Sequence, residues 1–390
     1  MDKVKIGNYI KQIRGVSYKS TDLHGDLNSD SVILLRANNI NEGKINFDDI
    51  VYVDKSKVKK EQYLKKGDIL VCASSGSKEL VGKAAFINKD YAVTFGAFCK
   101  LIRPKDCIAG YLGHYFNSQM YKEKISSLAL GANINNIRNE HIDELLIYLP
   151  NKAEQQNISI LLDEVSDLTD KRKKQLEKLD ELVKFRFVEM FGNVIRNDKG
   201  WEQYTFSDIA TSRLGKMLDA KQQTGKYAYP YLANFNVQWF RFEIENLNKM
   251  DFNEADRQEF ELRDGDLLVC EGGEIGRCAV WHNEIQPCYF QKALHRVRCN
   301  QHIVLPDYMA WWFKYNCDHK GFAAIEGAKA TIAHLPGAKL KVLKVTVPPI
   351  ELQNQFVAFL KQTDKSKLEV QKSLEKLEVL KKALMQKYFG

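Results

Sequence analysis

The stretch Gln175-Leu-Glu-Lys-Leu-Asp-Glu-Leu-Val-Lys184 decides the fold, because it returns 198 residues later as Ser373-Leu-Glu-Lys-Leu-Glu-Val-Leu-Lys-Lys382. Each copy lies in a longer segment that follows a proline, Pro150 or Pro348, and that ends in Phe-Gly. No glycine or proline interrupts the segment from residue 154 to 190 or its counterpart from 352 to 389. Both segments are therefore predicted to be long, unbroken helices that stop at the terminal glycine.

Apolar residues recur along both helices at alternating steps of three and four, a pattern typical of a coiled coil with one narrow apolar seam. The predicted seam consists of Leu161, Val165, Leu168, Leu176, Leu179, Leu182, Phe359, Thr363, Val370, Leu374, Leu377 and Leu384. A helix from about Glu154 to Met190 would be roughly 55 Å long at 1.5 Å per residue. Either the two helices only hold the protein together, or they act as a spacer that fixes the distance between the other parts of the repeat.

The repeat extends well beyond the helices. Lys66-Gly-Asp-Ile-Leu-Val-Cys72 is matched 198 residues later by Asp264-Gly-Asp-Leu-Leu-Val-Cys270, and Gly-Asp before an apolar run predicts a tight turn into a buried strand. Each half also contains an aromatic-rich segment, Tyr111–Phe116 or Tyr308–Phe313, which is predicted to be a core helix. Strands with embedded helices predict a small α+β domain of about 150 residues in each half.

The predicted fold class is therefore α+β, with two small domains in tandem repeat separated by two long helices. The predicted boundaries are residues 1–150 for the first domain, 151–199 for the central helix, 200–348 for the second domain and 349–390 for the C-terminal helix. Outside the shared landmarks the two halves differ considerably, as expected if each domain recognises a different target.

Composition describes an ordinary globular protein, with 390 residues, 44% hydrophobic and 28% charged. The formal net charge of +8 is compatible with a polyanionic partner but does not require one. The eight cysteines include no Cys-x-x-Cys pair and no His-Cys cluster, so a zinc site is not expected. The N-terminus has no apolar signal core and no stretch approaches a membrane span, so a reduced, cytoplasmic protein is predicted.

Motifs for catalysis are missing from the sequence. There is no phosphate-binding G-x-x-x-x-G-K-[ST] loop, no G-x-G-x-x-G after a strand and no H-E-x-x-H. The adenine-methyltransferase tetrad is also absent, because Val347-Pro348-Pro349-Ile350 has the prolines without their catalytic partners. These absences argue that the chain carries out no chemistry itself, and no catalytic or metal-ligating residue is assigned.

Polar and basic residues on predicted loops are the remaining candidates for a binding site. Arginine and lysine pair with guanine edges or phosphates, and asparagine pairs with adenine, so a DNA-binding surface needs these residue types. The candidates are Arg36, Asn38, Asn39, Ser74, Ser75, Ser77, Lys78, Lys83, Asn133 and Asn135 in the first half, and Asn234, Asn236, Arg241, Gly272, Gly273, Arg277 and Lys329 in the second. Each of them could equally be an ordinary solvated loop residue.

The arrangement resembles the specificity subunit of type I restriction–modification systems over essentially the whole chain. The resemblance rests on the two half-chain repeats, the Gly-Asp-Ile/Leu-Leu-Val strand starts and the glutamines that follow Pro150 and Pro348 at the start of each helix. The helices that end in Glu189-Met-Phe-Gly192 and Lys387-Tyr-Phe-Gly390 complete it. The order of these features, duplicated at one spacing, carries the resemblance.

The resemblance implies two target-recognition domains related by a pseudo-twofold axis, with the long helices packed as an antiparallel coiled coil. Each domain would read one half of a bipartite sequence in double-stranded DNA, and the helices would fix the unread gap. About 55 Å corresponds to roughly 16 base pairs of B-DNA. The subunit itself would not be an enzyme but would dock two modification (methyltransferase) subunits, and restriction subunits (the translocase/nuclease) would join them. S-adenosylmethionine, ATP and Mg²⁺ would belong to those partners, with no cofactor in this chain.

Two other readings remain open. The chain could be an enzyme, such as a methyltransferase or nuclease with unrecognised motifs, which would act on DNA alone. It could also be a coiled-coil adaptor that binds only proteins and has no DNA specificity.

Overall fold

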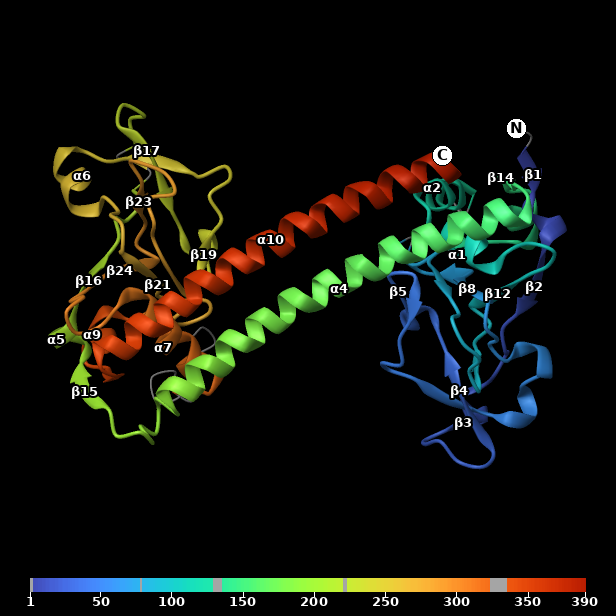
Figure 1. Ribbon diagram of the computed structural model, residues 1–390, viewed down its shortest axis with the longest axis horizontal. Coiled ribbons are helices and arrows are strands. Elements are labelled where there is room, and N and C mark those ends of the chain that lie inside the picture. The colour runs from blue at the N-terminus through green and yellow to red at the C-terminus, as the bar shows by residue number, and fades with distance from the viewer. Residues whose placement is uncertain (1–2, 78, 129–134, 220–222, 323–334) are drawn as a thin grey trace. The chain divides into compact units, whose positions relative to one another are not determined.

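The computed structural model describes residues 3–77, 79–128, 135–219, 223–322 and 335–390 (Figure 1). Two helices of 40 residues each, α4 (Lys152–Phe191) and α10 (Ile350–Phe389), confirm the two predicted long helices. Contacts divide the chain into a first unit, residues 1–174 and 371–390, and a second unit, residues 175–370. Each unit therefore contains one small domain and half of each long helix, whereas the predicted domain boundaries follow the ends of the helices.

The first unit is built on two four-stranded sheets. One is antiparallel and has the order β10 (Ala84–Phe86), β8 (Ile69–Cys72), β12 (Cys99–Pro104), β2 (Ile10–Arg14). The other has the order β11 (Val93–Phe95), β4 (Ser31–Leu35), β7 (Val51–Asp54), β3 (Leu23–His24), with β11 parallel to β4. Short strand pairs are β1 (Lys3–Lys5) with β14 (Leu146–Tyr148), β5 (Ile40–Asn41) with β6 (Lys44–Ile45), and β9 (Ser74–Ser75) with β13 (Asn135–Asn136). Its short helices are α1 (Ala109–Asn117), α2 (Gln119–Leu128) and α3 (Asn139–Asp143).

The second unit repeats this architecture. Its antiparallel sheet has the order β22 (Cys278–Val280), β21 (Leu267–Cys270), β24 (Leu294–Cys299), β16 (Ala210–Leu214). A second sheet has β23 (Tyr289–Phe290) parallel to β17 (Ala228–Leu232), which pairs with β20 (Lys249–Asp251). Short strand pairs are β15 (Glu202–Thr205) with β25 (Lys344–Val347), and β18 (Val237–Gln238) with β19 (Arg241–Phe242). Its short helices are α5 (Phe206–Ile209), α6 (Glu254–Phe260), α7 (Pro306–Asp318) and α9 (Gly337–Lys341).

The strand after Gly-Asp is buried on both faces, which explains its unbroken apolar run. In the first unit Gly67 turns the chain with a φ of +89°, a conformation that favours glycine. The following side chains alternate, because Ile69 and Val71 pack in the cluster that contains α1, while Leu70 and Cys72 pack in the cluster of the second sheet. β21 alternates in the same way in the second unit. The predicted buried strands are confirmed.

The aromatic segments are core helices, as predicted. Tyr111, Tyr115 and Phe116 of α1 are fully buried, and so are Tyr308 and Phe313 of α7. The hydroxyl of Tyr111 donates to the Tyr148 carbonyl at 2.6 Å, and Tyr308 makes the same bond to β25 in the second unit. These aromatic helices therefore fix the strand that leads into each long helix.

A buried glutamine fastens the start of each long helix to its domain. Gln353 Nε2 donates to the carbonyls of Ile303 and Pro348 at 3.0 and 2.8 Å, and its Oε1 accepts from the Leu305 N–H at 2.8 Å. Gln155 plays the same part in the first unit, because it donates to Pro150 O at 2.6 Å and accepts from the Ile108 N–H at 2.8 Å. Both side chains are almost completely buried.

Within each unit the two half-helices pack in opposite directions. In the second unit Asp180 of α4 forms an ion pair with Lys367 of α10 at 2.7 Å, and further along α4 the Phe191 ring lies 5.3 Å from that of Phe356. In the first unit, Ile158 of α4 shares a hydrophobic cluster with Phe389. Later residues of α4 therefore contact earlier residues of α10, so the two helices run antiparallel. Figure 1 shows α4 in green and α10 in red.

The buried stripe on the helices differs in part from the predicted seam. Of the predicted residues, Val165, Thr363, Val370 and Leu374 are buried, and Leu161, Leu176, Leu179, Phe359, Leu377 and Leu384 are half-buried. Leu168 and Leu182 are each 45% exposed, so their assignment to the seam is wrong. Thr169 and Val183 are buried instead, one residue further along. The Thr169 hydroxyl donates to the Val165 carbonyl at 2.8 Å, which satisfies its polar atom within the helix.

All eight cysteines are free thiols. Burial raises the pKa of the Cys72 thiol to about 11, so it is protonated at neutral pH. Among the described residues no group of three or more His, Cys, Asp or Glu side chains could hold a metal ion. No helix in the described parts of the chain has the length and apolar character needed to cross a membrane.

Candidate nucleic-acid interface

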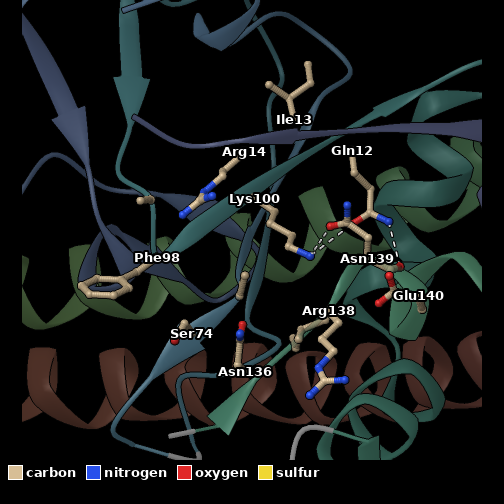
Figure 2. A pocket seen from close by; sticks show the side chains of 13 residues that line it. Gln12, Ile13, Arg14, Ser74, Phe98, Lys100, Asn136, Arg138, Asn139 and Glu140 are labelled. Carbon is tan, nitrogen blue, oxygen red and sulfur yellow. Dashed lines mark hydrogen bonds between the residues drawn. The ribbon is translucent and has the colours of Figure 1, made fainter. Parts of the chain in front are cut away.

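A polar hollow of about 640 Å³ lies in the first unit (Figure 2). It is formed where the end of β2, the turn between β11 and β12, and the segment that leads into α3 come together. The lining residues are Gln12, Ile13, Arg14, Ala73, Ser74, Ala97, Phe98, Lys100, Asn136, Ile137, Arg138, Asn139 and Glu140. Three of these are cations and one is an acid, so the hollow carries a positive charge.

Lys100 belongs to a hydrogen-bonded network of side chains on one side of the hollow. Its Nζ donates to Asn139 Oδ1 at 2.6 Å, and Gln12 Oε1 lies 3.5 Å away. Gln12 Nε2 in turn donates to the Asn139 carbonyl and to Asp143 Oδ1, both at 2.9 Å. Burial lowers the pKa of Lys100, and the nearby carboxylates of Glu140 and Asp143 oppose that shift. The direct partners of this ammonium group are neutral amides, so no carboxylate in the described part of the chain neutralises it by contact.

Four other side chains around the hollow are exposed and available. Arg14, Asn136 and Arg138 make no side-chain hydrogen bond or ion pair with any described residue, and Phe98 is 72% exposed. Figure 2 shows them around the opening, together with Lys100. Free guanidinium and amide groups beside an exposed aromatic ring can pair with base edges, contact phosphates or pack against a base.

Most predicted DNA-binding residues of the first half lie outside this hollow. Arg36 Nη2 and Asn38 Nδ2 both bind Asp49 Oδ2 at 2.8 Å, so a DNA contact would compete with that carboxylate. Asn39 is fully buried, with its Oδ1 accepting from the Arg36 N–H at 2.8 Å and its Nδ2 donating to Asp48 O at 2.6 Å. Asn39 therefore caps a turn, and its buried amide is not accessible to a base.

The remaining candidates of the first half are scattered. Ser74 lines the hollow, and the Ser75 hydroxyl accepts from the Ser77 N–H at 3.1 Å. Lys83 is half-buried just before β10, and Asn135 pairs with Ser75 in the β9–β13 ladder. Lys78 and Asn133 lie outside the described residues.

In the second half, several predicted residues do come together. Asn234 Nδ2 donates to the Gly272 carbonyl at 3.0 Å, and Arg277 Nη2 donates to the Asn234 carbonyl at 3.1 Å. The turn continues through Gly273, which has a φ of +79°. Arg277 also lies 3.5 Å from a Glu274 carboxylate oxygen, and it is mostly buried. These contacts hold the turn in place and occupy most of the polar groups of Asn234 and Arg277.

The other second-half candidates divide in the same way. Asn236 is buried, accepts from the Ala233 N–H and donates to the Glu243 carbonyl, both at 2.9 Å, and thus repeats the role of Asn39. Arg241 is exposed and lies 3.5 Å from Glu243. Lys329 lies outside the described residues.

The sequence-based predictions did not include the residues that build the hollow, above all Arg14, Phe98, Lys100 and Arg138. They belong to segments far apart in the chain, and strand register brings them together, since Lys100 on β12 pairs with Arg14 on β2. Comparison of the two halves of the internal repeat could have indicated these residues. Each of these positions carries a different residue type in the other half of the chain.

Comparison with known proteins gives one consistent family. Residues 16–179 and 198–381 each match the family described as type I restriction modification DNA specificity domain. The chain is 29% identical over 399 residues to the type I restriction enzyme EcoKI specificity subunit of Escherichia coli (strain K12), covering 97% of this chain and 86% of that protein. It is 33% identical over 270 residues to the StySPI specificity subunit of Salmonella potsdam, covering 66% of this chain and 58% of that protein.

Solved structures show the same fold. The S subunit of a type I restriction-modification system from M. genitalium superposes with a TM-score of 0.58 at 16% identity, covering 100% of this chain and 96% of that one. A chain from a structure of complex assembly and conformational transition in the type I R-M system gives a TM-score of 0.57 at 14% identity, with 97% of each chain covered.

Proposed function

The chain belongs to the type I restriction–modification DNA specificity family, and we propose that it selects the DNA sequence on which a type I complex acts. Each small domain reads one half of a bipartite target in double-stranded DNA. The first unit contributes one half-site and the second unit the other.

The observation that carries this proposal is a repeated framework with differing surfaces. The framework of the two units matches in the strand order of the antiparallel sheet, in the buried glutamine at the start of each long helix and in the buried aspartate of each Gly-Asp turn. Asp68 accepts from Arg103 Nε and Nη2 at 2.8 and 2.7 Å, and Asp266 binds an arginine of β24 in the same bidentate way. The polar surfaces on this framework are different in the two units. One scaffold used twice with different surfaces suits a protein that reads two different half-sites.

The chemistry of modification and restriction is assigned to other subunits. In this proposal the chain is not an enzyme, and two methyltransferase subunits dock on it, joined by restriction subunits. S-adenosylmethionine, ATP and Mg²⁺ act on those partners, and no residue of this chain is assigned to hold them. The support for this division is the family membership together with the absence of known catalytic motifs from the sequence.

The long helices are proposed to be both spacer and docking surface. α4 and α10 are each uninterrupted over 40 residues, and each unit holds half of both. A rigid helical pair of this kind fixes the unread gap between the half-sites. Exposed apolar residues on the helices, such as Phe185 at 67% and Val379 at 70%, leave surface for protein partners.

A selection experiment tests the proposal. The purified chain, assembled with the modification subunit of its own operon, is incubated with random DNA duplexes, and the bound fraction is sequenced. We expect enrichment of a bipartite motif, with binding that weakens steeply as salt rises because phosphate contacts release counterions. Methyl transfer or cleavage by the chain alone would favour the enzyme reading. An assembled complex that enriches no sequence would favour the protein-binding adaptor.

A further inference from the structure

We infer that the hollow of the first unit is a base-reading site with no counterpart among the described residues of the second unit, in which Arg14 and Arg138 read guanine and Phe98 packs against a neighbouring base. This inference rests on the proposed function, because it assumes that each unit reads its own half-site. It names the residues and the base class for one of the two half-sites.

Hydrogen-bond register identifies the equivalent positions in the two units. Lys100 pairs with Arg14 in the first unit, and His295 pairs with Leu214 in the second. Both pairs join the third strand of the antiparallel sheet to its edge strand. His295 therefore stands where Lys100 stands, and Leu214 stands where Arg14 stands.

Backbone hydrogen bonds also identify the second-unit counterparts of the residues on the other two sides of the hollow. The Phe98 carbonyl accepts from the Ala73 N–H at 2.9 Å, and the Ala293 carbonyl accepts from the N–H of Glu271, the counterpart of Ala73, at 3.0 Å. The carbonyls of Ala73 and Glu271 then accept from the N–H groups of Ile137 and Leu335 at 2.7 and 2.6 Å. Ala293 is thus equivalent to Phe98.

Counting on from Ile137 and Leu335 gives the last equivalences. Pro336 stands where Arg138 stands, and Gly337 stands where Asn139 stands. All three cations and the exposed aromatic ring of the first-unit hollow are therefore replaced in the second unit by apolar residues or by His295.

His295 confirms that the second unit uses this position for packing. It is 2% exposed, and its Nε2 lies 3.0 Å from the Leu335 carbonyl, so that nitrogen carries the hydrogen and donates. Burial lowers the pKa of His295, which keeps the imidazole neutral at neutral pH. The equivalent Lys100 is a cation that holds Asn139 and Gln12 in place. The same framework position therefore carries a lysine that lines the hollow in the first unit and a buried, neutral histidine in the second.

The chemistry of the hollow points to guanine. Two arginines that have no carboxylate partner among the described residues flank one opening, and bidentate pairing of arginine with guanine O6 and N7 is the commonest specific contact to a base. Phe98 presents an apolar face at the same opening, which suits contact with a thymine methyl group or a base plane. Lys100 is a positioning residue, because it holds the segment that carries Arg138 against β2 and β12.

Arginine-to-lysine variants test the inference most sharply. Arg14→Lys and Arg138→Lys keep the positive charge but lose the planar guanidinium fork, so they separate reading of guanine from simple attraction to phosphate. Each variant is assembled with the modification subunit and used to select duplexes from a random library. We expect at least one of them to reduce discrimination for a G·C pair by about tenfold or more. The affected position lies in one half-site, and the other half-site and the gap stay unchanged.

Matched variants complete the design. Phe98→Ala is expected to relax a position in the same half-site, and Lys105→Ala, which removes an exposed charge just beyond the opposite end of β12, is expected to leave the motif unchanged. The inference is overturned if Arg14→Lys and Arg138→Lys both select the wild-type motif with the preferences of Lys105→Ala, or if altered positions fall in both half-sites. A wild-type complex that enriches no motif would instead remove the proposed function, and the inference with it.

Discussion

Gln353 shows how one buried side chain joins a helix to a domain. It has no exposed surface and makes three hydrogen bonds to backbone groups on two different segments. No apolar residue could replace it without leaving a buried N–H and two buried carbonyls short of a partner. Gln155 makes two of the corresponding bonds in the first unit, to the Pro150 carbonyl and from the Ile108 N–H, so this arrangement belongs to the shared framework.

Replacing Gln353 with alanine should destabilise the second unit by about 3 kcal/mol or more, because three buried backbone groups lose their partner and each costs about 1–3 kcal/mol. All five tryptophans lie between residues 201 and 312, so tryptophan fluorescence during urea unfolding reports on the second unit alone. The control is Asn354→Ala, since that exposed amide bonds only to a carbonyl of its own helix, Ile350 O, at 2.9 Å. Equal midpoints for the two variants would contradict this account of Gln353.

Asn39 and Asn236 show why residue type alone did not identify the interface. Asparagine is a suitable partner for adenine, but the same amide is also a suitable cap for a turn. Only burial and hydrogen bonding distinguish the two roles, and both residues are buried caps. Asn39 and Asn236 make the same cap in both repeats and so belong to the shared framework, whereas the equivalent positions of Lys100 and His295 carry different residues.

At the scale of elements, the long helices were predictable because their signal is local. An apolar stripe, an absence of glycine and proline and a terminal Phe-Gly are all visible in one stretch of sequence. The detail of the stripe was less predictable, because α4 packs on more than α10. Phe187 of α4 lies against Phe356 of α10 at 5.5 Å and against Tyr308 of α7 at 5.9 Å. Burial near the helix end therefore follows the domain as well as the helical pair, and it passes through Val183 instead of Leu182.

Insertions test the role of the helices as a spacer. A seven-residue insertion between Lys174 and Gln175 of α4, combined with one between Val370 and Gln371 of α10, adds two helical turns where the contact units divide. We expect the gap between half-sites to lengthen by about three base pairs, since seven residues add about 10 Å and each base pair about 3.4 Å. The half-sites themselves should stay the same in the sequences that the assembled complex selects.

The matched controls are the two single insertions. Either one alone should break the registration of the helical pair and reduce assembly with the modification subunit. A double insertion that changed the identity of a half-site, or that left the gap unaltered, would show that the helices do not set the spacing.

At the scale of the whole molecule, the tandem repeat could be read from the sequence, but the reading surface could not. The repeat gave the two domains, the long helices and the family resemblance, because its landmarks recur at one fixed spacing. The hollow depends on three segments that meet only through strand register and through the hydrogen bonds of Lys100, Gln12 and Asn139. No local pattern in the sequence records such a meeting of distant segments.

A map of methylated adenines shows directly whether the chain selects a bipartite DNA target. The chain is expressed with the modification subunit of its own operon in a host that lacks other adenine methylation, and the methylated positions are read across the genome. We predict a single bipartite motif, with two different half-sites separated by a fixed gap, that disappears when the chain is omitted. A continuous motif, a gap of variable length, or no methylation that depends on the chain in a complex shown to assemble would contradict it.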